Sequence, residues 1–583
     1  MILNKFKEKY SRDEFTNSFI ILLAVIILGT FLLSLFFIPL FRILQYAFYT
    51  DSQFSFSMFF STISNTTNLI FLARDTLAQA LLSTVFCLII GVPASYFFAK
   101  YDFKGRKIII NLLTVPFVLP PIVVLLGFIV AYGEGGWVNV IWRNIFSTEN
   151  SLISIFGTYE GIIFAHVFYN LSVIIRMTIP AWESLDFDQI EVARSLGANN
   201  WRIFRKIIFP QIINYIISAA LLVFVYTFNS FAIVLFLGEA RFQTLEVRIF
   251  KQMKDSLNFS GGASLVIIQL LINTLIIILY LWFERRTRQM ASGKEKGLQK
   301  TKLRFSKRKW KTNLRTTGII LLIILIGLFT FAPIFAVIIE SFMPFSEGVS
   351  SLWGYKQLLS NEYMNILNNS PLRLLLNTLL FAVVATVITL VLSLLIVLVL
   401  RNRYESLRKY RRPLAEGLIS YMIILPMATS SITLAIGLFL QYRNTEIYQS
   451  AVWLFIILSH VLISVPFATR SILSAYNRID IELLNVASTL GASRLRIFRK
   501  IELPMMMRGI LVGGIFSFAI SLGEFGATNF LVRDVFGTLS IGISKLITSQ
   551  TLQLPATMAS ILIIITVLCF LIIQKIGEVE LKV

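Results

Sequence analysis

A block of twenty residues occurs twice in this chain of 583 residues, beginning at Glu191 and again at Asn485. The first copy reads EVARSLGANNWRIFRKIIFP and the second reads NVASTLGASRLRIFRKIELP, so that twelve of the twenty positions are identical. The two copies are separated by 294 residues, which is about half of the chain. The chain is therefore a tandem duplication, and whatever the block does is done twice.

The repeat extends well beyond this block. At the same offset, His166 pairs with His460, which are the only two histidines, and Thr84 pairs with Thr378. Two copies of one structural unit are the expected outcome of such a duplication. We expect a first repeat, a linker and a second repeat, at residues 1–283, 284–317 and 318–583.

Composition indicates a membrane protein. Hydrophobic residues make up 56% of the chain and charged residues 14%, with a mean hydropathy of +0.77. In soluble domains about half of the residues are apolar and about a quarter are charged. A helix needs about 20 apolar residues to cross the roughly 30 Å of hydrocarbon in a bilayer. The sequence therefore predicts an all-α polytopic membrane protein with about twelve transmembrane helices, arranged as two direct repeats of six.

The expected spans lie near residues 18–42, 76–99, 108–133, 156–181, 213–237, 263–283, 318–340, 373–400, 415–440, 450–472, 508–530 and 556–575. The runs at 156–181 and 450–472 are the least hydrophobic of the twelve. Ten or eleven spans are therefore the alternative to twelve.

Charge predicts the orientation. Most of the 53 Lys and Arg residues fall in the two tails and in alternate loops, and such an excess is typical of cytoplasmic loops. Both termini and the basic linker at 284–317 are thus expected in the cytoplasm. The net charge of +22 then reflects topology and contact with anionic lipid rather than nucleic-acid binding. Cys87 and Cys569 both lie in expected spans, which excludes a disulfide framework or a cysteine-based metal site.

The repeated block predicts a short helix, a bend and a second short helix. Ile190, Ala193 and Leu196 recur at helical spacing, and an apolar face resumes after Gly197. Glycine takes positive φ without a steric cost, so it suits a sharp turn at a helix C-terminus. Pro210 then marks the start of the next span, where a missing N–H matters least.

A cationic stripe runs beside this apolar face in both copies of the block. Its members are Arg202, Arg205 and Lys206 in the first copy and Arg496, Arg499 and Lys500 in the second. An amphipathic helix that lies on the membrane surface would show such a stripe as well. The fixed register of glycine and proline in two copies favours contact with another protein.

The spacing Glu-x-Ala-x3-Gly-x9-Ile-x-x-Pro resembles the EAA loop of the membrane-spanning subunits of binding-protein-dependent ABC importers. The matching residues are Glu191, Ala193, Gly197, Ile207 and Pro210 in the first copy, and Ala487, Gly491, Ile501, Leu503 and Pro504 in the second. Two features depart from the pattern: valine replaces its first alanine at Val192 and Val486, and Asn485 replaces its glutamate. The second loop is therefore expected to dock on its partner more weakly than the first, or against a differently shaped cleft.

The resemblance extends over both halves of the chain. The segments YGEGGW, AHVFYN, SLGEFGATNFL and TLSIGI are similar to the fused, double-length permeases of iron(III) and thiamine uptake systems; they lie at 132–137, 165–170, 521–531 and 538–543. The resemblance implies a type I permease fold in a prokaryotic cytoplasmic membrane and transport by alternating access. It leaves the substrate open between iron(III), thiamine and another small solute.

The resemblance also implies partners. In this family the loop docks into a cleft on an ATP-hydrolysing subunit, so we expect an ATPase homodimer on the cytoplasmic side and a solute-binding protein outside. The chain has no G-x4-G-K-[ST] phosphate loop. It is therefore expected to be a transport subunit and not an enzyme, with no cofactor or metal of its own, while ATP binds to the partner.

Two other classes of protein would also contain many transmembrane helices. An ion-coupled secondary transporter or channel built from direct repeats would carry several buried ionisable residues along its pathway. A membrane enzyme would need a cluster of nucleophiles, bases or metal ligands near one interface. Two histidines 294 residues apart and few intramembrane carboxylates argue against the enzyme, and the transporter or channel is the main alternative.

A few polar residues in the expected spans are candidates for the transport pathway. Glu524 falls in the span at 508–530, where an ionisable group is costly and is functional by default; a buried structural pair is the alternative. Its repeat partner is Ser230, beside Asn229. His166 and His460 are candidates too, but a hydrogen bond between helices of the two halves is the favoured interpretation for them.

Overall fold

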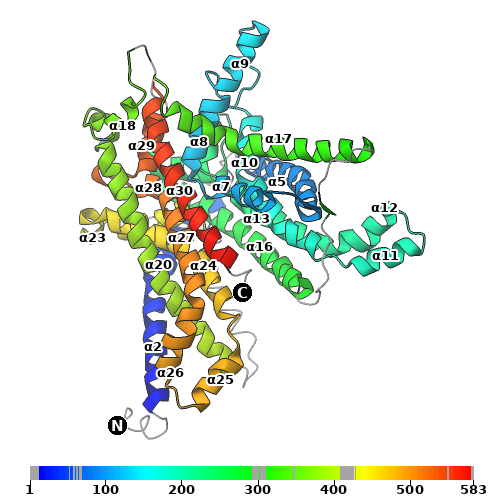
Figure 1. Ribbon diagram of the computed structural model, residues 1–583. Coiled ribbons are helices and arrows are strands. Elements are labelled where there is room, and N and C mark those ends of the chain that lie inside the picture. The colour runs from blue at the N-terminus through cyan, green and yellow to red at the C-terminus, as the bar shows by residue number, and fades with distance from the viewer. Residues whose placement is uncertain are drawn as a thin grey trace. The chain divides into compact units, whose positions relative to one another are not determined.

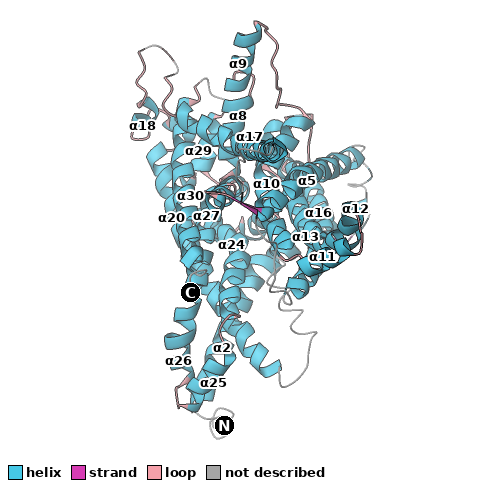
Figure 2. Cartoon of the chain, turned by 45° about the vertical axis from the view of Figure 1, so that its right-hand side comes forward, coloured by secondary structure: helices cyan, strands magenta, loops and turns pink. Residues whose placement is uncertain are grey.

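The structure is a computed structural model. It describes residues 12–50, 53–54, 56, 59–60, 64, 69–239, 241–291, 301–302, 310–344, 346, 348–407, 426, 429–547 and 551–579. Helices account for nearly all of the secondary structure in these residues, which confirms the all-α prediction (Figure 2). Two short strand pairs are the exceptions: β1 (Tyr49–Thr50) lies antiparallel to β2 (Gln53–Phe54), and β3 (Tyr101–Asp102) lies parallel to β4 (Thr301–Lys302).

Within the described part of the chain, 11 helical segments are long and apolar enough to cross a membrane. They are Leu22–Phe48, Ile70–Lys100, Pro121–Phe146, Tyr159–Glu183, Asn200–Phe228, Phe259–Glu284, Thr316–Glu340, Met364–Leu400, Val452–Tyr476, Arg494–Gly523 and Gln553–Ile573. The expected span at 415–440 lies partly outside the described residues, and a shorter apolar helix, α22 (Ser431–Tyr442), stands at its end. Residues 292–300 and 303–309 of the expected linker are also outside them.

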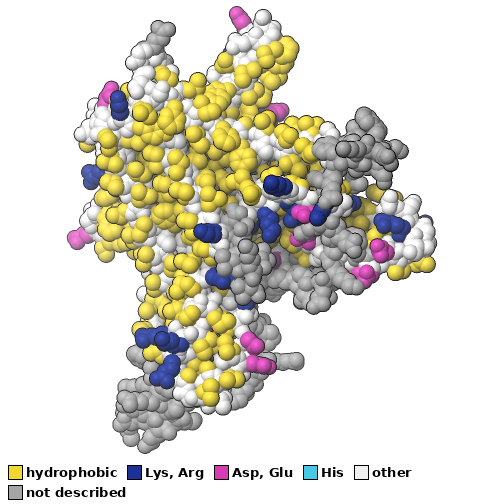
Figure 3. Space-filling model, in the orientation of Figure 1, with side chains coloured by type: hydrophobic (Ala, Val, Ile, Leu, Met, Phe, Trp, Pro, Cys, Tyr) yellow, Lys and Arg dark blue, Asp and Glu magenta, His cyan; other side chains and the backbone are white. Residues whose placement is uncertain are grey.

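The surface of these helices suits a lipid environment. On α20 (Pro371–Leu407), four large apolar side chains spaced three or four residues apart are each more than half exposed: Leu376, Leu380, Val383 and Val387. A contiguous apolar face of this kind is rare on a soluble monomer, but it faces hydrocarbon at no cost. Figure 3 shows apolar side chains over most of the visible surface, with a group of Lys and Arg side chains near α26.

The chain divides into two compact units that do not coincide with the two sequence repeats. Unit 1 comprises Met1–Phe54, Leu359–Gly542 and Ile564–Val583, and unit 2 comprises Ser55–Leu358 and Ile543–Ile563. The first span of each repeat therefore belongs to the unit that holds most of the other repeat.

Unit 2 contains most of the first repeat together with the first span of the second, α17 (Trp310–Glu340) (Figure 1). Its other long helices are α5 (Leu69–Lys100), α10 (Tyr159–Glu183), α13 (Phe209–Phe228) and α16 (Phe259–Ala291). Its short elements include α15 (Leu245–Phe250), η3 (Lys251–Asp255) and α18 (Trp353–Gln357).

Unit 1 begins with α2 (Arg12–Leu32), η1 (Leu33–Phe37) and α3 (Ile38–Phe48), which form the first span of the chain. Its other long helices are α20, α24 (Val452–Tyr476) and α27 (Leu503–Gly523). Its short elements include α19 (Met364–Leu367), α23 (Glu446–Ser450) and η5 (Asp534–Phe536). The helices α29 (Leu539–Leu546) and α30 (Gln553–Val579) are divided between the units.

The first span of each repeat, which belongs to the unit of the other repeat, packs in the same way in both units. In unit 2 a methyl group on Gly127 would lie 2.8 Å from the carbonyl oxygen of Pro333 on α17, and in unit 1 one on Gly437 would lie 3.0 Å from Cβ of Pro39 on α3. A small residue in each receiving helix lets the backbones approach closely, as is common in membrane helix pairs. The two prolines are related by the offset of 294 residues.

The expected span at 108–133 is not one continuous helix. It forms α6 (Arg106–Leu112), α7 (Val115–Val118) and α8 (Pro121–Tyr132), and α9 (Trp137–Phe146) follows. The reason is the set of three prolines at 116, 120 and 121, which cannot donate the N–H that a continuous helix requires.

The expected spans at 213–237 and 508–530 are interrupted as well. The helix α13 ends at Phe228 and resumes as α14 (Ala232–Leu237), while α27 ends at Gly523 and resumes as α28 (Gly526–Leu531). At both breaks a polar side chain makes a hydrogen bond to the backbone of an adjoining helix. Asn229 donates to the carbonyl of Val225, and Glu524 accepts from the N–H of Ala527.

Candidate functional site

The two copies of the repeated block fold identically. The first forms α11 (Phe187–Ser195), α12 (Asn200–Ile203) and η2 (Phe204–Ile208), which runs into α13. The second forms α25 (Ile481–Thr489), α26 (Arg494–Ile497) and η4 (Phe498–Glu502), which runs into α27. Every boundary is shifted by 294 residues. We call these two segments coupling loops; each projects from the end of its own unit (Figure 1).

The bend in each coupling loop is a glycine with positive φ, as the sequence predicts. Gly197 and Gly491 both have φ of 79°. The N–H of Gly197 donates to the carbonyl of Arg194 at 3.0 Å, and that of Ala198 donates to Ala193 at 3.0 Å. The same two bonds recur around Gly491. This pair of bonds is the Schellman ending of a helix, which needs a left-handed residue and so favours glycine.

The second part of each loop differs from the expected short helix. It continues without a break into the following span, through the π-helical turns η2 and η4. Pro210 and Pro504 lie two residues beyond these turns. A proline ring clashes with the carbonyl four residues earlier, and a π turn is a common way for a helix to absorb such an irregularity. The second part of each loop and the following span thus form one continuous helical segment.

The tips of the coupling loops expose large apolar side chains. Leu196 and Leu490 are both 82% exposed, and Val192 and Val486 are 58% and 57% exposed. These residues lie outside the spanning segments, where exposed apolar clusters mark binding surfaces. Around them, the structure exposes Glu191, Asn485, Arg202, Arg205, Arg496, Arg499, Pro210 and Pro504, and half-buries Ala193 and Ala487.

Each coupling loop is anchored to its unit by buried apolar residues. In unit 2, Phe204 and Ile208 of η2 pack against Ala181, Trp182 and Leu185 at the end of α10. In unit 1, Leu484 and Ile497 belong to one buried cluster with Ile472 of α24. The exposed tips thus stand on a packed base, which holds the loop in a defined position.

Both histidines bridge helices of their own unit. His166 contacts Ser83 of α5 through Nδ1 at 3.2 Å and Ser230 through Nε2 at 2.8 Å. His460 contacts Ser521 through Nδ1 at 2.7 Å and Thr528 through Nε2 at 2.9 Å. These bonds join the histidine's helix to other elements, but each lies within one half of the chain, whereas a bond between the two halves was expected.

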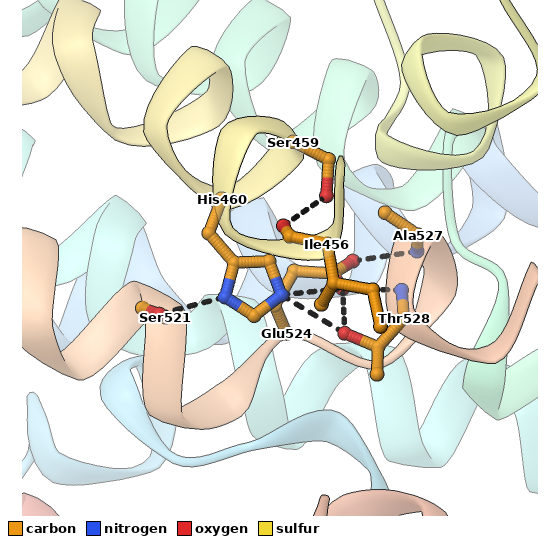
Figure 4. A network of polar contacts seen from close by, with 7 residues as sticks. All are labelled: Ile456, Ser459, His460, Ser521, Glu524, Ala527 and Thr528. Carbon is orange, nitrogen blue, oxygen red and sulfur yellow. Dashed lines mark hydrogen bonds and ion pairs between the residues drawn. The ribbon is translucent and has the colours of Figure 1, made fainter. Parts of the chain in front are cut away.

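Glu524 lies at the helix break, surrounded by hydrogen-bond donors (Figure 4). One carboxylate oxygen accepts from the N–H of Ala527 at 2.8 Å, and the other accepts from the N–H and the hydroxyl of Thr528, each at 2.9 Å. Nε2 of His460 is 3.5 Å from that second oxygen. The carboxylate therefore caps the N-terminus of α28, where a negative charge is favourable.

Another buried carboxylate, not expected from the sequence, is that of Glu246 in α15, which is 1% exposed. It accepts a hydrogen bond from Nε2 of Gln269 on α16. The same Nε2 donates to Oδ1 of Asn229 at 2.9 Å, and Nδ2 of Asn273 donates to that Oδ1 at 2.8 Å. The helix α15 follows an expected span and is only six residues long, so hydropathy gave no sign that it is buried.

The repeat offset is not constant along the chain. The N–H of Leu245 donates to the hydroxyl of Thr76 at 2.9 Å, and that of Leu539 donates to Thr378 at 2.8 Å. Leu245 and Leu539 differ by 294 residues, whereas the two threonines differ by 302. Thr76, and not Thr84, is thus the structural equivalent of Thr378. The reason is that the second repeat is eight residues shorter between Thr378 and His460 than the first is between Thr76 and His166.

Comparison of the sequence with known proteins shows the family to which these two repeats are similar. The family described as binding-protein-dependent transport system inner membrane component matches residues 91–289 and 406–578. The thiamine transport system permease protein ThiP of Salmonella typhimurium is 26% identical over 523 residues, covering 88% of this chain and 90% of the relative. ThiP of Brucella abortus (strain 2308) is 31% identical over 209 residues, covering 36% and 38%.

Among solved structures, a bacterial ABC transporter involved in the import of the acidic polysaccharide alginate is similar with a TM-score of 0.38 and 17% identity. It covers 46% of this chain and 95% of that one.

Proposed function

Because the chain belongs to the family of binding-protein-dependent transport system inner membrane components, we propose that it forms the complete membrane domain of an importer for thiamine or a thiamine-like cation. The observation that carries this proposal is the presence of two coupling loops with the same fold in one chain. A permease of two separate subunits would have one loop on each. One fused chain replaces the pair.

The family membership establishes the general role. The chain is an inner membrane permease of an ABC importer; it works with a solute-binding protein and a separate ATPase, and ATP binds to the ATPase. We propose further that the ATPase is a homodimer, that the two exposed loop tips dock into its two equivalent clefts, and that the solute-binding protein lies outside the membrane. The matched exposure of Leu196 and Leu490 supports two similar docking contacts.

The proposed substrate follows from the relatives. A thiamine permease of Salmonella typhimurium aligns over 88% of this chain, which favours thiamine over iron(III). Alternating access would move the solute inward as closure of the ATPase draws the coupling loops together.

The test of this function is uptake by the reconstituted system. Proteoliposomes that contain the chain, its ATPase and its solute-binding protein should accumulate radiolabelled thiamine only when ATP and the binding protein are both supplied. The permease without its ATPase should show no accumulation. Uptake that follows an ion gradient and ignores ATP would instead identify a secondary transporter.

We also propose that both termini and the coupling loops face the cytoplasm, because Lys and Arg gather in the corresponding loops. A cysteine introduced at Ser350 should react with an impermeant thiol reagent in intact cells. One introduced at Ser292, which lies outside the described residues, should react only after the cells are opened. Labelling at Ser292 in intact cells would reverse the orientation.

A further inference from the structure

A buried polar centre lies in unit 2, at the point where α13 is interrupted. Asn229 stands at the break, and it contacts Gln269 and Asn273 of α16 as described above. Gln269 is 10 residues inside the span Phe259–Glu284, which places it about 15 Å from the start of that span. The hydrocarbon layer is about 30 Å thick, so this centre is near its middle. Polar side chains at that depth are costly and mark functional sites.

Two further elements, α5 and α15, contribute hydrogen bonds to the centre. From α5, Nε2 of Gln79 donates to the carbonyl of Thr227 at 2.8 Å, and the hydroxyl of Thr76 accepts from the N–H of Leu245. This second bond fixes the start of α15, so that the next residue, Glu246, reaches Gln269. Four elements of one unit, α5, α13, α15 and α16, thus meet at this centre.

The centre also holds polar atoms that lack a partner. Oε1 of Gln79, Oγ1 of Thr244 and Oε1 of Gln269 are buried without any hydrogen bond, and these three residues are 1%, 2% and 1% exposed. The two amide oxygens can only accept hydrogen bonds. Buried acceptors are nearly always satisfied in folded proteins. A ligand that brings positive charge or N–H donors would satisfy them, and an anionic one would not.

The repeat relation sets this carboxylate apart. The partner of Glu246 in the second repeat is Ser540, while the partner of Glu524 in the first is Ser230. The carboxylates of Glu246 and Glu524 thus each lie at a position where the other half has serine, which is not the case for the other two buried carboxylates of the described residues, Asp75 and Glu502. Glu524 is occupied as the cap of α28 by backbone N–H groups, whereas Glu246 lies among the amide side chains of α13 and α16.

We propose that Glu246, with Gln269 and Asn229, forms the site that recognises a cationic solute inside the membrane domain. This inference rests on the proposed function, in which the chain imports a thiamine-like cation, and it deepens that function by assigning the recognising residues. The carboxylate of Glu246 meets the positive charge of the solute. The unpaired amide oxygens of Gln79 and Gln269 accept hydrogen bonds from its amino group.

Binding of radiolabelled thiamine to the permease–ATPase complex in nanodiscs, without the solute-binding protein, tests the assignment. Glu246→Gln should weaken binding at least tenfold, because it removes the charge and keeps the shape. The melting temperature should stay near that of the wild type, since the amide oxygen of the new glutamine can still accept the hydrogen bond from Nε2 of Gln269. Glu246→Asp keeps the charge and should lose less affinity than Glu246→Gln.

Ser540→Ala is the matched control at the repeat-related position. The hydroxyl of Ser540 is buried without a partner, so its removal should leave thiamine binding unchanged. Wild-type binding in Glu246→Gln, while the wild-type complex still shows ATP-driven uptake, would overturn the inference and leave the proposed function intact. A loss of binding matched by a fall in melting temperature would overturn it too, by showing a structural role. A wild-type complex that neither binds nor transports thiamine would overturn both.

Discussion

Replacing Gly197 by valine should lower ATP-driven uptake at least tenfold while the protein still inserts and assembles, and Gly491→Val should do the same. Both glycines have φ of 79°, a conformation that a β-branched residue adopts only under strain, at a cost of about 1–3 kcal/mol. A side chain at either position would meet no atom within 4 Å. The effect is therefore conformational: the bend opens, and the tip that carries Leu196 or Leu490 is displaced.

Two control variants separate this effect from general damage. Asparagine tolerates positive φ, so Gly197→Asn should keep most of the uptake. Gly327 lies within α17 and also has no atom within 4 Å of an added methyl group, so Gly327→Val should be nearly silent. Uptake assays and ATPase pull-down would measure transport and assembly separately. Normal uptake in both coupling-loop valine variants would show that the loops carry no motion from the ATPase.

The coupling loops could be predicted from the sequence because their pattern depends on local interactions. A helix that ends in the Schellman bonds of Gly197 uses only residues within one turn, and spacing alone shows such a signal. The continuation of α12 through Pro210 was harder to predict, because proline usually marks the start of a helix. Only the observed π turn shows how the chain accommodates it.

The features that the sequence did not predict depend on contacts between distant segments. Hydropathy marks an apolar run but not a break inside it, so the interruptions at Asn229 and Glu524 were not expected. The exchange of the first spans between units depends on close packing such as that of Pro333 on Gly127. Glu246 was missed because α15 is short, although its pairing with Ser540 at the repeat offset was a signal present in the sequence.

The variant Glu524→Gln should lose stability, and its transport per assembled complex should stay near that of the wild type. The carboxylate accepts three hydrogen bonds at the break between α27 and α28. An amide has one acceptor oxygen, and its NH2 group would face a backbone N–H that also donates. Hydrogen bonds to buried charged groups contribute about 1.5–3 kcal/mol each, so the loss of one should clearly lower the unfolding temperature in detergent.

Ser230→Ala is the matched variant in the first repeat, because Ser230 occupies the position of Glu524 and contacts His166 through one neutral hydrogen bond of 2.8 Å. That bond contributes only about 1 kcal/mol, so this variant should unfold closer to the wild type. Measuring thermal unfolding and uptake per assembled complex on both variants decides between the two roles of Glu524. Intact stability with impaired transport would make Glu524 a pathway residue, in which case His460, 3.5 Å away, would join it there.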